Sequence, residues 1–194
     1  MVHRAAGLAK ICVVAVLLQA CSGKKQPDKM PVYNFASIHV HLQAGILMDD
    51  KGPFTGIIYS LQPNQRDTSE IVCFKQGKEE GLWKKFYPGG KLAEQRYFSN
   101  GKKVGEYDAW WPNSAKKLIY HFKDGEYDGL NRAWSDKGIL MEVMNYKNGY
   151  EDGRQEQYYD NGKVKANYIM MSGRRYGLLG TKNCVNVTDS VFKK

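Results

Sequence analysis

The sequence is poor in the residues on which most enzymes and metal sites depend. It contains only four histidines and four cysteines among 194 residues. No serine stands in the Gly-x-Ser-x-Gly pattern of many hydrolases. No glycine-rich stretch has the strand, loop and helix context, or the Lys-Ser/Thr pair, of a phosphate-binding loop. We therefore predict no catalytic residues, no cofactor and no metal.

The sequence also lacks a hydrophobic run long enough to span a bilayer. The longest N-terminal run, Ile11–Leu18, is far shorter than the roughly 20 apolar residues that a spanning helix needs. Arg4 and Lys10 precede it, a pattern that fits the hydrophobic core of a cleavable signal peptide. We expect residues 1–20 to be this signal.

The segment Leu18-Gln19-Ala20-Cys21 then resembles the bacterial lipobox. The resemblance implies a diacylglycerol thioether on Cys21, cleavage before it, and acylation of its new amino group, for which palmitate is expected. Ser22 follows, where Asp retains many lipoproteins in the inner membrane, so an outer-membrane location is favoured. An uncleaved anchor, or a secreted protein with a chance cysteine, are the alternatives.

Charge of one sign is not concentrated anywhere. The formal net charge is +9, and removal of Arg4 and Lys10 leaves 27 basic against 20 acidic residues, a net charge of +7. This excess is spread thinly along the chain, whereas nucleic-acid binders cluster Lys and Arg on one face. We expect a solvated mixed-charge surface and no nucleic-acid partner, although basic character could favour contact with anionic headgroups.

Two cysteines are left for the folded region, because Cys12 leaves with the signal and Cys21 takes lipid. Cys73 and Cys184 lie four to five repeat units apart in the sequence. Two strands per unit at about 4.8 Å each would separate them by roughly 40 Å. A disulfide needs Cα atoms within about 7 Å, so both cysteines are predicted to be unpaired.

Glycine, by contrast, recurs at a fixed interval of 24 residues. Each of these glycines is followed four positions later by another, and this self-similarity indicates a repeat architecture. The regular units run from 77 to 180, and a degenerate unit spans 52–76. The opening glycines are Gly77, Gly101, Gly125, Gly149 and Gly173.

Within each unit the pattern predicts one β-hairpin. A ring stands nine residues after the opening glycine, a Gly- or Asn-containing turn follows, and a run alternating in polarity completes the unit. Two strands alone are marginal in water, so the hairpins should stack, with each buried ring contributing about 1.5–3 kcal/mol. We predict an all-β, elongated and curved antiparallel sheet without helices or parallel connections, although closure into a barrel stays open. The rings expected in the core are Phe86, Trp110, Trp134 and Tyr158.

The segments around the repeats have different compositions. Residues 21–31 are polar with two prolines and should form a flexible tether. Residues 32–51 are rich in β-branched and aromatic side chains and should form an N-terminal cap, which repeat arrays need. Residues 181–194 are expected to close the array with a strand and a frayed end.

The units resemble MORN repeats in their bacterial variant form. Gly77-Lys-Glu-Glu-Gly-Leu-Trp-Lys-Lys-Phe-Tyr-Pro-Gly-Gly-Lys-Leu carries the family pattern, as does Gly149-Tyr-Glu-Asp-Gly-Arg-Gln-Glu-Gln-Tyr-Tyr-Asp-Asn-Gly-Lys-Val, in which Gln155 replaces an aromatic residue. In the third unit, Asn131 also departs from the family pattern. The resemblance covers about residues 52–180. It implies stacked hairpins, and bacterial lipoproteins of this kind are often labelled antitoxin components of toxin–antitoxin systems, which implies an interaction role.

A second aromatic row follows the first by one residue, at Tyr87, Trp111 and Tyr159. Adjacent residues of a strand point to opposite faces, so this row should face away from the predicted core. If that face is open, its rings could bind an extended peptide, glycan or lipid. Strand curvature or lysine stems could equally cover it.

We therefore predict a lipid-anchored, non-enzymatic envelope protein that binds a protein or envelope polymer, with Tyr87, Trp111 and Tyr159 as candidates for the binding face. One alternative is an antitoxin-like component that neutralises a cognate toxin. A less favoured alternative is an enzyme that uses Cys184, near Lys182, or the pair His39 and His41. The two histidines would share a strand face but lack the further ligands of a closed metal site.

Overall fold

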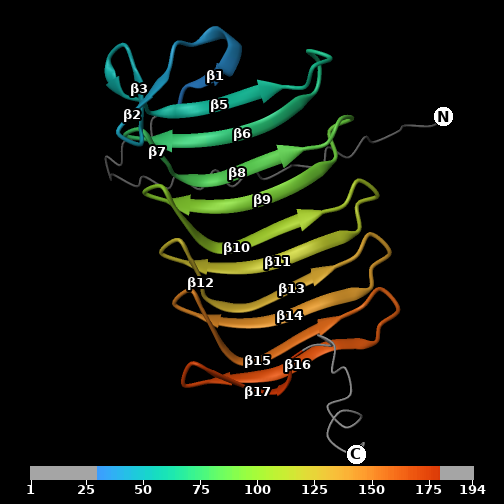
Figure 1. Cartoon of the computed structure of the whole chain (residues 1–194). Helices are drawn as coiled ribbons and strands as arrows, with labels where there is room; N and C mark the ends of the chain where they lie inside the picture. Colours follow the sequence, from blue (N-terminus) through green and yellow to red (C-terminus); the bar gives the residue numbers. More distant parts are fainter. Residues whose placement is uncertain (1–29, 180–194) are drawn as a thin grey trace, which may run out of the picture.

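The computed structural model describes residues 30–179 (Figure 1). The predicted signal peptide, Cys21, Cys184 and the predicted closing segment 181–194 lie outside this range. Within it the chain forms one sheet of 14 strands and a second sheet of three strands. The predicted all-β array of stacked hairpins is confirmed.

The strands of the large sheet follow one another across the molecule almost in sequence order. The order is β1-β5-β6-β8-β9-β10-β11-β13-β14-β15-β16-β17, with β7 on β6 and β12 on β11, so the sheet is open and has β1 and β17 at its edges. Its strands are β1 (Val32–Asn34), β5 (Gly56–Leu61), β6 (Thr68–Lys75), β7 (Lys78–Glu79), β8 (Gly81–Phe86), β9 (Leu92–Ser99), β10 (Lys102–Trp110), β11 (Lys116–Lys123), β12 (Glu126–Tyr127), β13 (Gly129–Trp134), β14 (Leu140–Lys147), β15 (Tyr150–Tyr158), β16 (Val164–Met171) and β17 (Arg174–Leu178).

The opening glycine of each unit lies in a tight turn between hairpins. Asn100 and Gly101 have φ of 51° and 78°, and positive φ at both central residues defines a type I′ turn, which glycine adopts without strain. The Gly101 N–H then donates to the Glu79 carbonyl of the preceding unit, at 2.9 Å. Gly125 and Gly149 repeat this bond one and two units later. Each turn is thereby bonded to an equivalent backbone carbonyl in the preceding unit, which maintains the 24-residue period.

The opposite end of each hairpin is joined to the next unit by a side chain. The Gln62 amide donates to the Phe86 carbonyl at 2.9 Å, and the Tyr87 hydroxyl donates to the Trp110 carbonyl at 2.9 Å. The Trp111 indole N–H donates to the Trp134 carbonyl at 3.0 Å. These donors occupy one position of three successive units, so that position links neighbouring hairpins.

The rings predicted to form the core are only half-buried. Each of the four ends its strand, directly after a shift in the pairing register, as between Ala109 and Trp110. Neighbouring strands cover a ring less well at such an end, and a single sheet offers no second layer. The buried apolar residues instead include Phe54, Ile58, Ala93, Ala109, Phe122, Met144, Ala166 and Tyr168.

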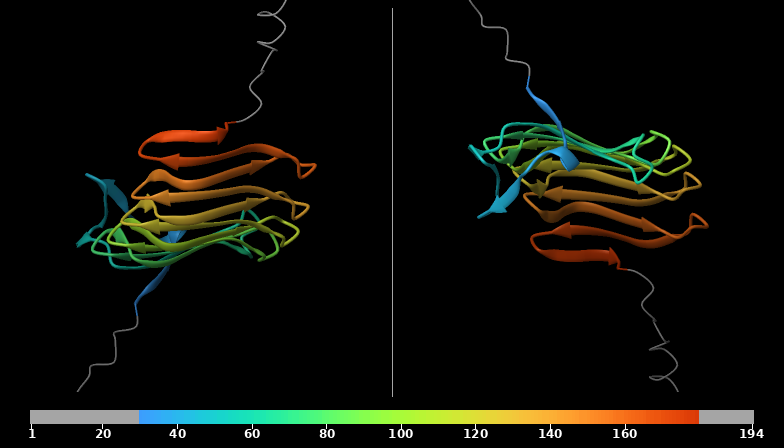
Figure 2. Two further views of the ribbon diagram at one scale, coloured as in Figure 1. Left: turned by 90° about the horizontal axis from the view of Figure 1, so that it is seen from below. Right: turned by 90° about the horizontal axis from the view of Figure 1, so that it is seen from above.

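The N-terminal end is built differently from the repeats. β1 pairs with β5 in parallel, Val32 opposite Ile57, which corrects the prediction of a sheet without parallel neighbours. After one turn of 3-10 helix, η1 (Phe35–Ser37), a small sheet forms from β2 (His41–Gln43), β3 (Ile46–Asp49) and β4 (Gly52–Pro53). Figure 2 shows the large sheet as a single twisted layer with this small sheet projecting to one side.

Candidate binding face

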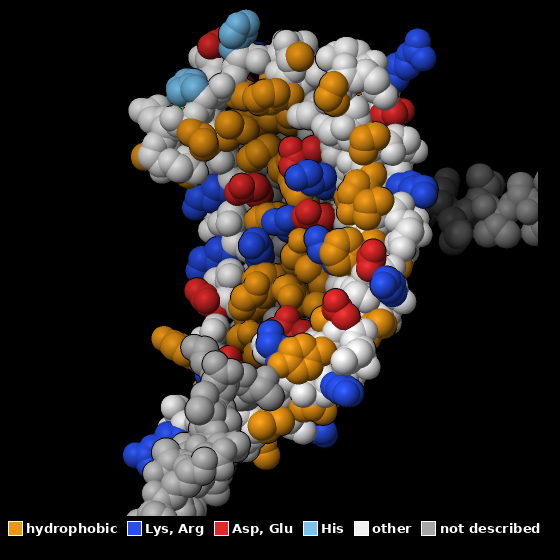
Figure 3. Space-filling model, turned by 45° about the vertical axis from the view of Figure 1, so that its right-hand side comes forward, with side chains coloured by type: hydrophobic (Ala, Val, Ile, Leu, Met, Phe, Trp, Pro, Cys, Tyr) orange, Lys and Arg blue, Asp and Glu red, His pale blue; other side chains and the backbone are white. Residues whose placement is uncertain are grey.

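One face of the large sheet carries a series of rings, which we call the aromatic face. It is defined by Trp83, Tyr107, Tyr120, Phe122, Tyr127, Tyr146 and Tyr168. The ring centroids of Tyr120 and Tyr127 are 5.7 Å apart, and those of Tyr127 and Tyr146 are 5.0 Å apart. Figure 3 shows hydrophobic side chains gathered along a hollowed face, with acidic and basic side chains among them. Rings from successive units thus form one surface across the array.

A basic side chain fills the aromatic face near its N-terminal end. The Arg96 guanidinium carbon lies 4.0 Å from the centre of the Trp83 ring and 4.6 Å from that of Tyr107. The same guanidinium is paired with the Glu94 carboxylate, which also accepts a 3.1 Å hydrogen bond from the Tyr107 hydroxyl. Carboxylate and rings therefore offset the charge of the cation, although Arg96 Nε is buried without a hydrogen-bond partner, and this part of the face is internally neutral.

A similar arrangement stands near the C-terminal end. The Tyr168 hydroxyl donates to Glu151 Oε1 at 3.0 Å, and the Arg175 guanidinium lies 3.1 Å from Glu151 Oε2. The Arg175 guanidinium carbon is 5.1 Å from the centre of the Tyr168 ring. The chain thus again places its own cation between a carboxylate and a ring.

The tyrosines of this face keep their protons well above neutral pH. Burial, followed by the charge of Glu94, raises the pKa of Tyr107 to about 12. Burial, followed by the charge of Glu142, raises the pKa of Tyr120 to about 12, and burial with a hydrogen bond to Glu151 does the same for Tyr168. Their phenols are neutral hydrogen-bond donors rather than bases.

Two buried amides replace rings at one position of this face. Asn131 Oδ1 accepts from the His121 N–H at 2.7 Å. Gln155 Oε1 accepts from the Asn145 N–H at 3.1 Å, while its amide nitrogen donates to the Asn145 carbonyl at 2.7 Å. Both amides are almost fully buried, at 2% and 0% exposure, and serve backbone groups that would otherwise be unpaired. Their departure from the repeat pattern is structural.

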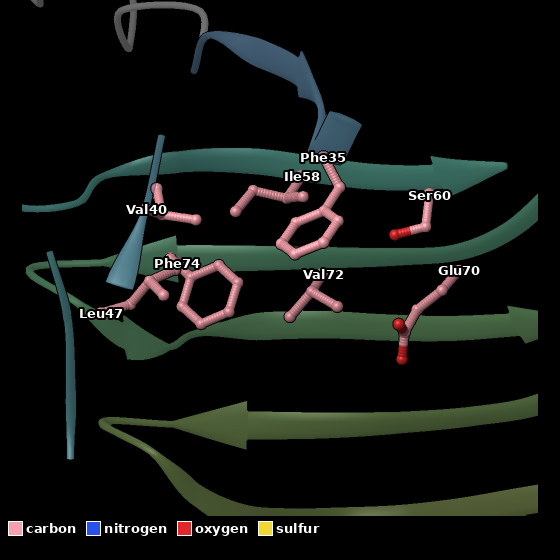
Figure 4. Close-up of a pocket in the computed structure, with 8 residues that line it drawn as sticks. All are labelled: Phe35, Val40, Leu47, Ile58, Ser60, Glu70, Val72 and Phe74. Atoms are coloured by element: carbon pink, nitrogen blue, oxygen red, sulfur yellow. The ribbon is translucent and has the colours of Figure 1, made fainter. Parts of the chain in front are cut away.

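The N-terminal end of the face contains an apolar pocket of about 220 Å³. Figure 4 shows Phe35, Val40 and Leu47 of the N-terminal segment opposite Ile58, Val72 and Phe74 of the large sheet. Ser60 and Glu70 supply the polar groups at one side. The cap therefore closes the end of the sheet incompletely and leaves a space lined mainly by hydrocarbon.

A smaller pocket of about 50 Å³ lies in the middle of the same face. Its wall contains three tyrosines and one acid, and Asn131 and Met144 complete it. Glu142 is the acid, and the rings are Tyr120, Tyr127 and Tyr146. Sequence reasoning did not bring Glu142 and the three tyrosines together, because they come from three strands and stand at different positions within the repeat.

The three residues predicted as binding-face candidates lie at the hairpin end of their units. Tyr87 and Trp111 are half-buried, because each bonds the backbone of the next unit and Lys117 Nζ covers Trp111 at 4.6 Å from the ring centre. Tyr159 is 39% exposed and lines a surface hollow with Met141 and Lys165. Tyr87 and Trp111 thus join neighbouring units, and Tyr159 reaches the surface.

The side chains considered for chemistry are dispersed. His39 and His41 are exposed on the N-terminal segment, and residues 30–179 contain no group of three His, Cys, Asp or Glu side chains that could hold a metal. Cys73 has a free thiol, 3.5 Å from the Met30 sulfur. Burial and the charge of Glu80 raise the pKa of this thiol, which lowers its thiolate fraction and reactivity.

No helix in the described range is long and apolar enough to cross a membrane.

Comparisons with known proteins bear on the repeats. No curated protein matches the chain. A crystal structure of accessory secretory protein 1,2 and 3 in Streptococcus pneumoniae shares 14% identity at a TM-score of 0.18, over 69% of this chain and 21% of that chain. This chain thus spans about a fifth of the length of that protein. Residues 79–100 and 151–168 match the MORN repeat variant family. The two 24-residue hairpins that contain these segments are therefore similar to MORN repeats of the variant type.

Proposed function

We propose that this protein is a non-enzymatic binding scaffold held at the bacterial envelope by lipid on Cys21. Its aromatic face would bind a protein or an envelope polymer. The observation that carries the proposal is the series of rings on this face, in which ring contacts run unbroken from Tyr107 on β10 to Tyr146 on β14. MORN repeats are generally non-catalytic, which also favours a binding role.

The shape of the face supports an extended partner. The two pockets, of about 220 and 50 Å³, both belong to the face and lie on different units of the array. Hollowed surfaces across stacked repeats are a common means of binding elongated ligands, and exposed apolar surface often marks an interaction site. A partner that lies along the array would contact both pockets at once.

The hairpin-end residues are the proposed flank of this binding region. The exposed side chain of Tyr159 would contact the partner directly, whereas Tyr87 and Trp111 would act through their hydrogen bonds between neighbouring hairpins. Substitution of Tyr159 by Ala should then weaken partner binding less than a change on the aromatic face. An equal or larger loss would move the main contact to the hairpin end.

The binding role can be tested by recovery of partners from membranes. Full-length protein carrying Tyr127→Ala should recover less partner, because Tyr127 lies at the centre of the ring series. Tyr97→Ala is the matched control, since Tyr97 is 40% exposed on β9 and alternates with Arg96 onto the other face. Circular dichroism and thermal melting would establish that both variants fold. Equal recovery with both folded variants would contradict the proposal.

The anchor requires a separate experiment. Metabolic labelling with an alkyne analogue of palmitate should mark the wild-type protein and leave Cys21→Ser unlabelled. Mass spectrometry should place the mature N-terminus at Cys21, and fractionation should place the protein in the outer membrane. A soluble, unlabelled wild-type protein would refute the anchor and leave the binding face untouched as a proposal.

A further inference from the structure

The small pocket in the middle of the aromatic face combines a carboxylate with three aromatic rings. Glu142 shares it with Tyr120, Tyr127 and Tyr146. The charge of Glu142 acts on two of these rings, since it contributes to the raised pKa of both Tyr120 and Tyr146. A negative group beside electron-rich ring faces is the environment in which an organic cation is most strongly attracted.

The same chain contains a filled version of this arrangement two units earlier. Glu94 stands 48 residues before Glu142, at the same position of its repeat. There, the Arg96 guanidinium pairs with the carboxylate and stacks on Trp83 and Tyr107. The site at Glu94 therefore shows that a carboxylate beside aromatic rings in this sheet accommodates a cation.

In the later unit the chain supplies no such cation. Met144 occupies the position of Arg96, and it is 4% exposed, packed into the pocket wall. The residues directly opposite Glu142 on the two neighbouring strands are Ala133 and Gln157, which are uncharged. Across residues 30–179, no basic side chain forms an ion pair with Glu142.

Two other acids of the sheet are paired with a cation that also lies over a ring. Asp108 pairs with Lys116 at 2.6 Å, and the Lys116 ammonium lies 4.2 Å from the centre of the Trp110 ring. Glu151 pairs with Arg175 over Tyr168. This sheet thus repeatedly completes an acid and a ring with a cation of its own, and at Glu142 it does not.

We propose that the pocket formed by Glu142, Tyr120, Tyr127 and Tyr146 binds the cationic end of a lysine or arginine side chain carried by the partner. The inference deepens the proposed binding function and rests on it. The size of the pocket is suitable, because about 50 Å³ exceeds the roughly 10–15 Å³ that one water needs. A partner's side chain is favoured over a free amine because the pocket lies within a longer face that an extended chain can follow.

The test uses small probes on the purified full-length protein in detergent, with its tyrosine rings labelled for NMR. n-Butylammonium and n-butylguanidinium should shift the ring signals of Tyr120, Tyr127 and Tyr146, whereas neutral n-butanol should not. If neither cation shifts these signals up to its solubility limit, or if butanol acts equally, the proposal is overturned.

Three variants locate the binding. Glu142→Gln should weaken binding of the cation about tenfold, because it removes the charge and keeps the shape. Glu106→Gln is the matched control, since it makes the same change at a residue that alternates with Tyr107 onto the other face, and it should leave binding within about twofold. Met144→Arg, which restores the residue found at 96, should block the probe from within. Unchanged binding in folded Glu142→Gln would refute the assignment.

Partner recovery separates this inference from the proposed function. If Tyr127→Ala loses the partner while the cation probes fail to bind, the face is a binding surface and the cation site is wrong. If the probes bind and no variant of the face affects partner recovery, the pocket binds cations and the proposed function fails.

Discussion

The two ends of the array differ in how completely their apolar side chains are covered. At the N-terminal end, Phe54 and Ile58 are only 3% and 6% exposed, because β1, η1 and the small sheet lie against the first hairpin. At the C-terminal end, Ala166 and Tyr168 of β16 are buried, but other apolar side chains of β16 and β17 are about half exposed, as in Met171 at 58% and Tyr176 at 50%. A repeat that is nearly constant in sequence therefore does not determine how its ends are covered, and the non-repeated segments do.

The comparison predicts a strongly unequal response to loss of a ring. Phe54→Ala should lower the free energy of unfolding by about 3–5 kcal/mol, because a buried ring in edge contact with Tyr33 and Phe74 leaves a cavity. Tyr176→Ala should cost less than about 0.5 kcal/mol, as is usual at an exposed site. Urea unfolding followed by tryptophan fluorescence measures both. Comparable losses would show that the C-terminal end is covered as well as the N-terminal one.

The opening glycines sharpen the comparison, since the same turn occurs at both ends. Gly77 and Gly173 have φ of 75° and 73°, so alanine meets the same backbone strain of about 1–2 kcal/mol at each. A Cβ at Gly77 would also collide with Ile46 and lie 2.6 Å from the Leu47 carbonyl oxygen, whereas nothing lies within 4 Å of a Cβ at Gly173. Gly77→Ala should therefore cost about 3 kcal/mol and Gly173→Ala about 1 kcal/mol. Equal costs would mean that the cap does not press on the first turn.

The period and the hairpins could be predicted because they depend on local chemistry. Asn-Gly and Asp-Gly at 24-residue spacing specify type I′ turns, and the structure has them with positive φ at both residues. The position of the core could not be predicted in the same way. The register shift before Trp110 is set by pairing between strands, and it moves the ninth-position rings to the ends of their strands.

The candidate site was harder to predict from the sequence than the fold. The pocket at Glu142 joins side chains from several strands, and its character depends on Met144 standing where an earlier unit has Arg96. Comparison of equivalent positions between units could have revealed that difference. The roles of Asn131 and Gln155 could not have been found so, because each serves a backbone group left unpaired on a neighbouring strand.

The links at the hairpin end give a smaller effect that also changes along the array. Trp111→Phe keeps a ring but removes the donor to the Trp134 carbonyl, which should cost about 1 kcal/mol of unfolding free energy. In the next unit Ser135 accepts from the Ile139 N–H within its own turn, at 3.1 Å, so Ser135→Ala should cost less. Thermal denaturation compares the two. A larger loss for Ser135→Ala would show that the turn, and not the link between units, stabilises this end.

The smallest expected effect concerns whether the aromatic face is as well shielded from water near its C-terminal end as near its N-terminal end. Tyr107 and Tyr168 both have a pKa raised to about 12, although Tyr168 lies on β16 beside the exposed β17. A tyrosine titrates near 10 in an unfolded chain, so between about pH 10 and pH 12 the unfolded state binds fewer protons and stability falls as pH rises. The two ring signals should therefore titrate together near pH 12 in an NMR titration. If Tyr168 titrates near pH 10 while Tyr107 does not, the last hairpin opens before the rest of the array. The shielded part of the aromatic face would then end before β16.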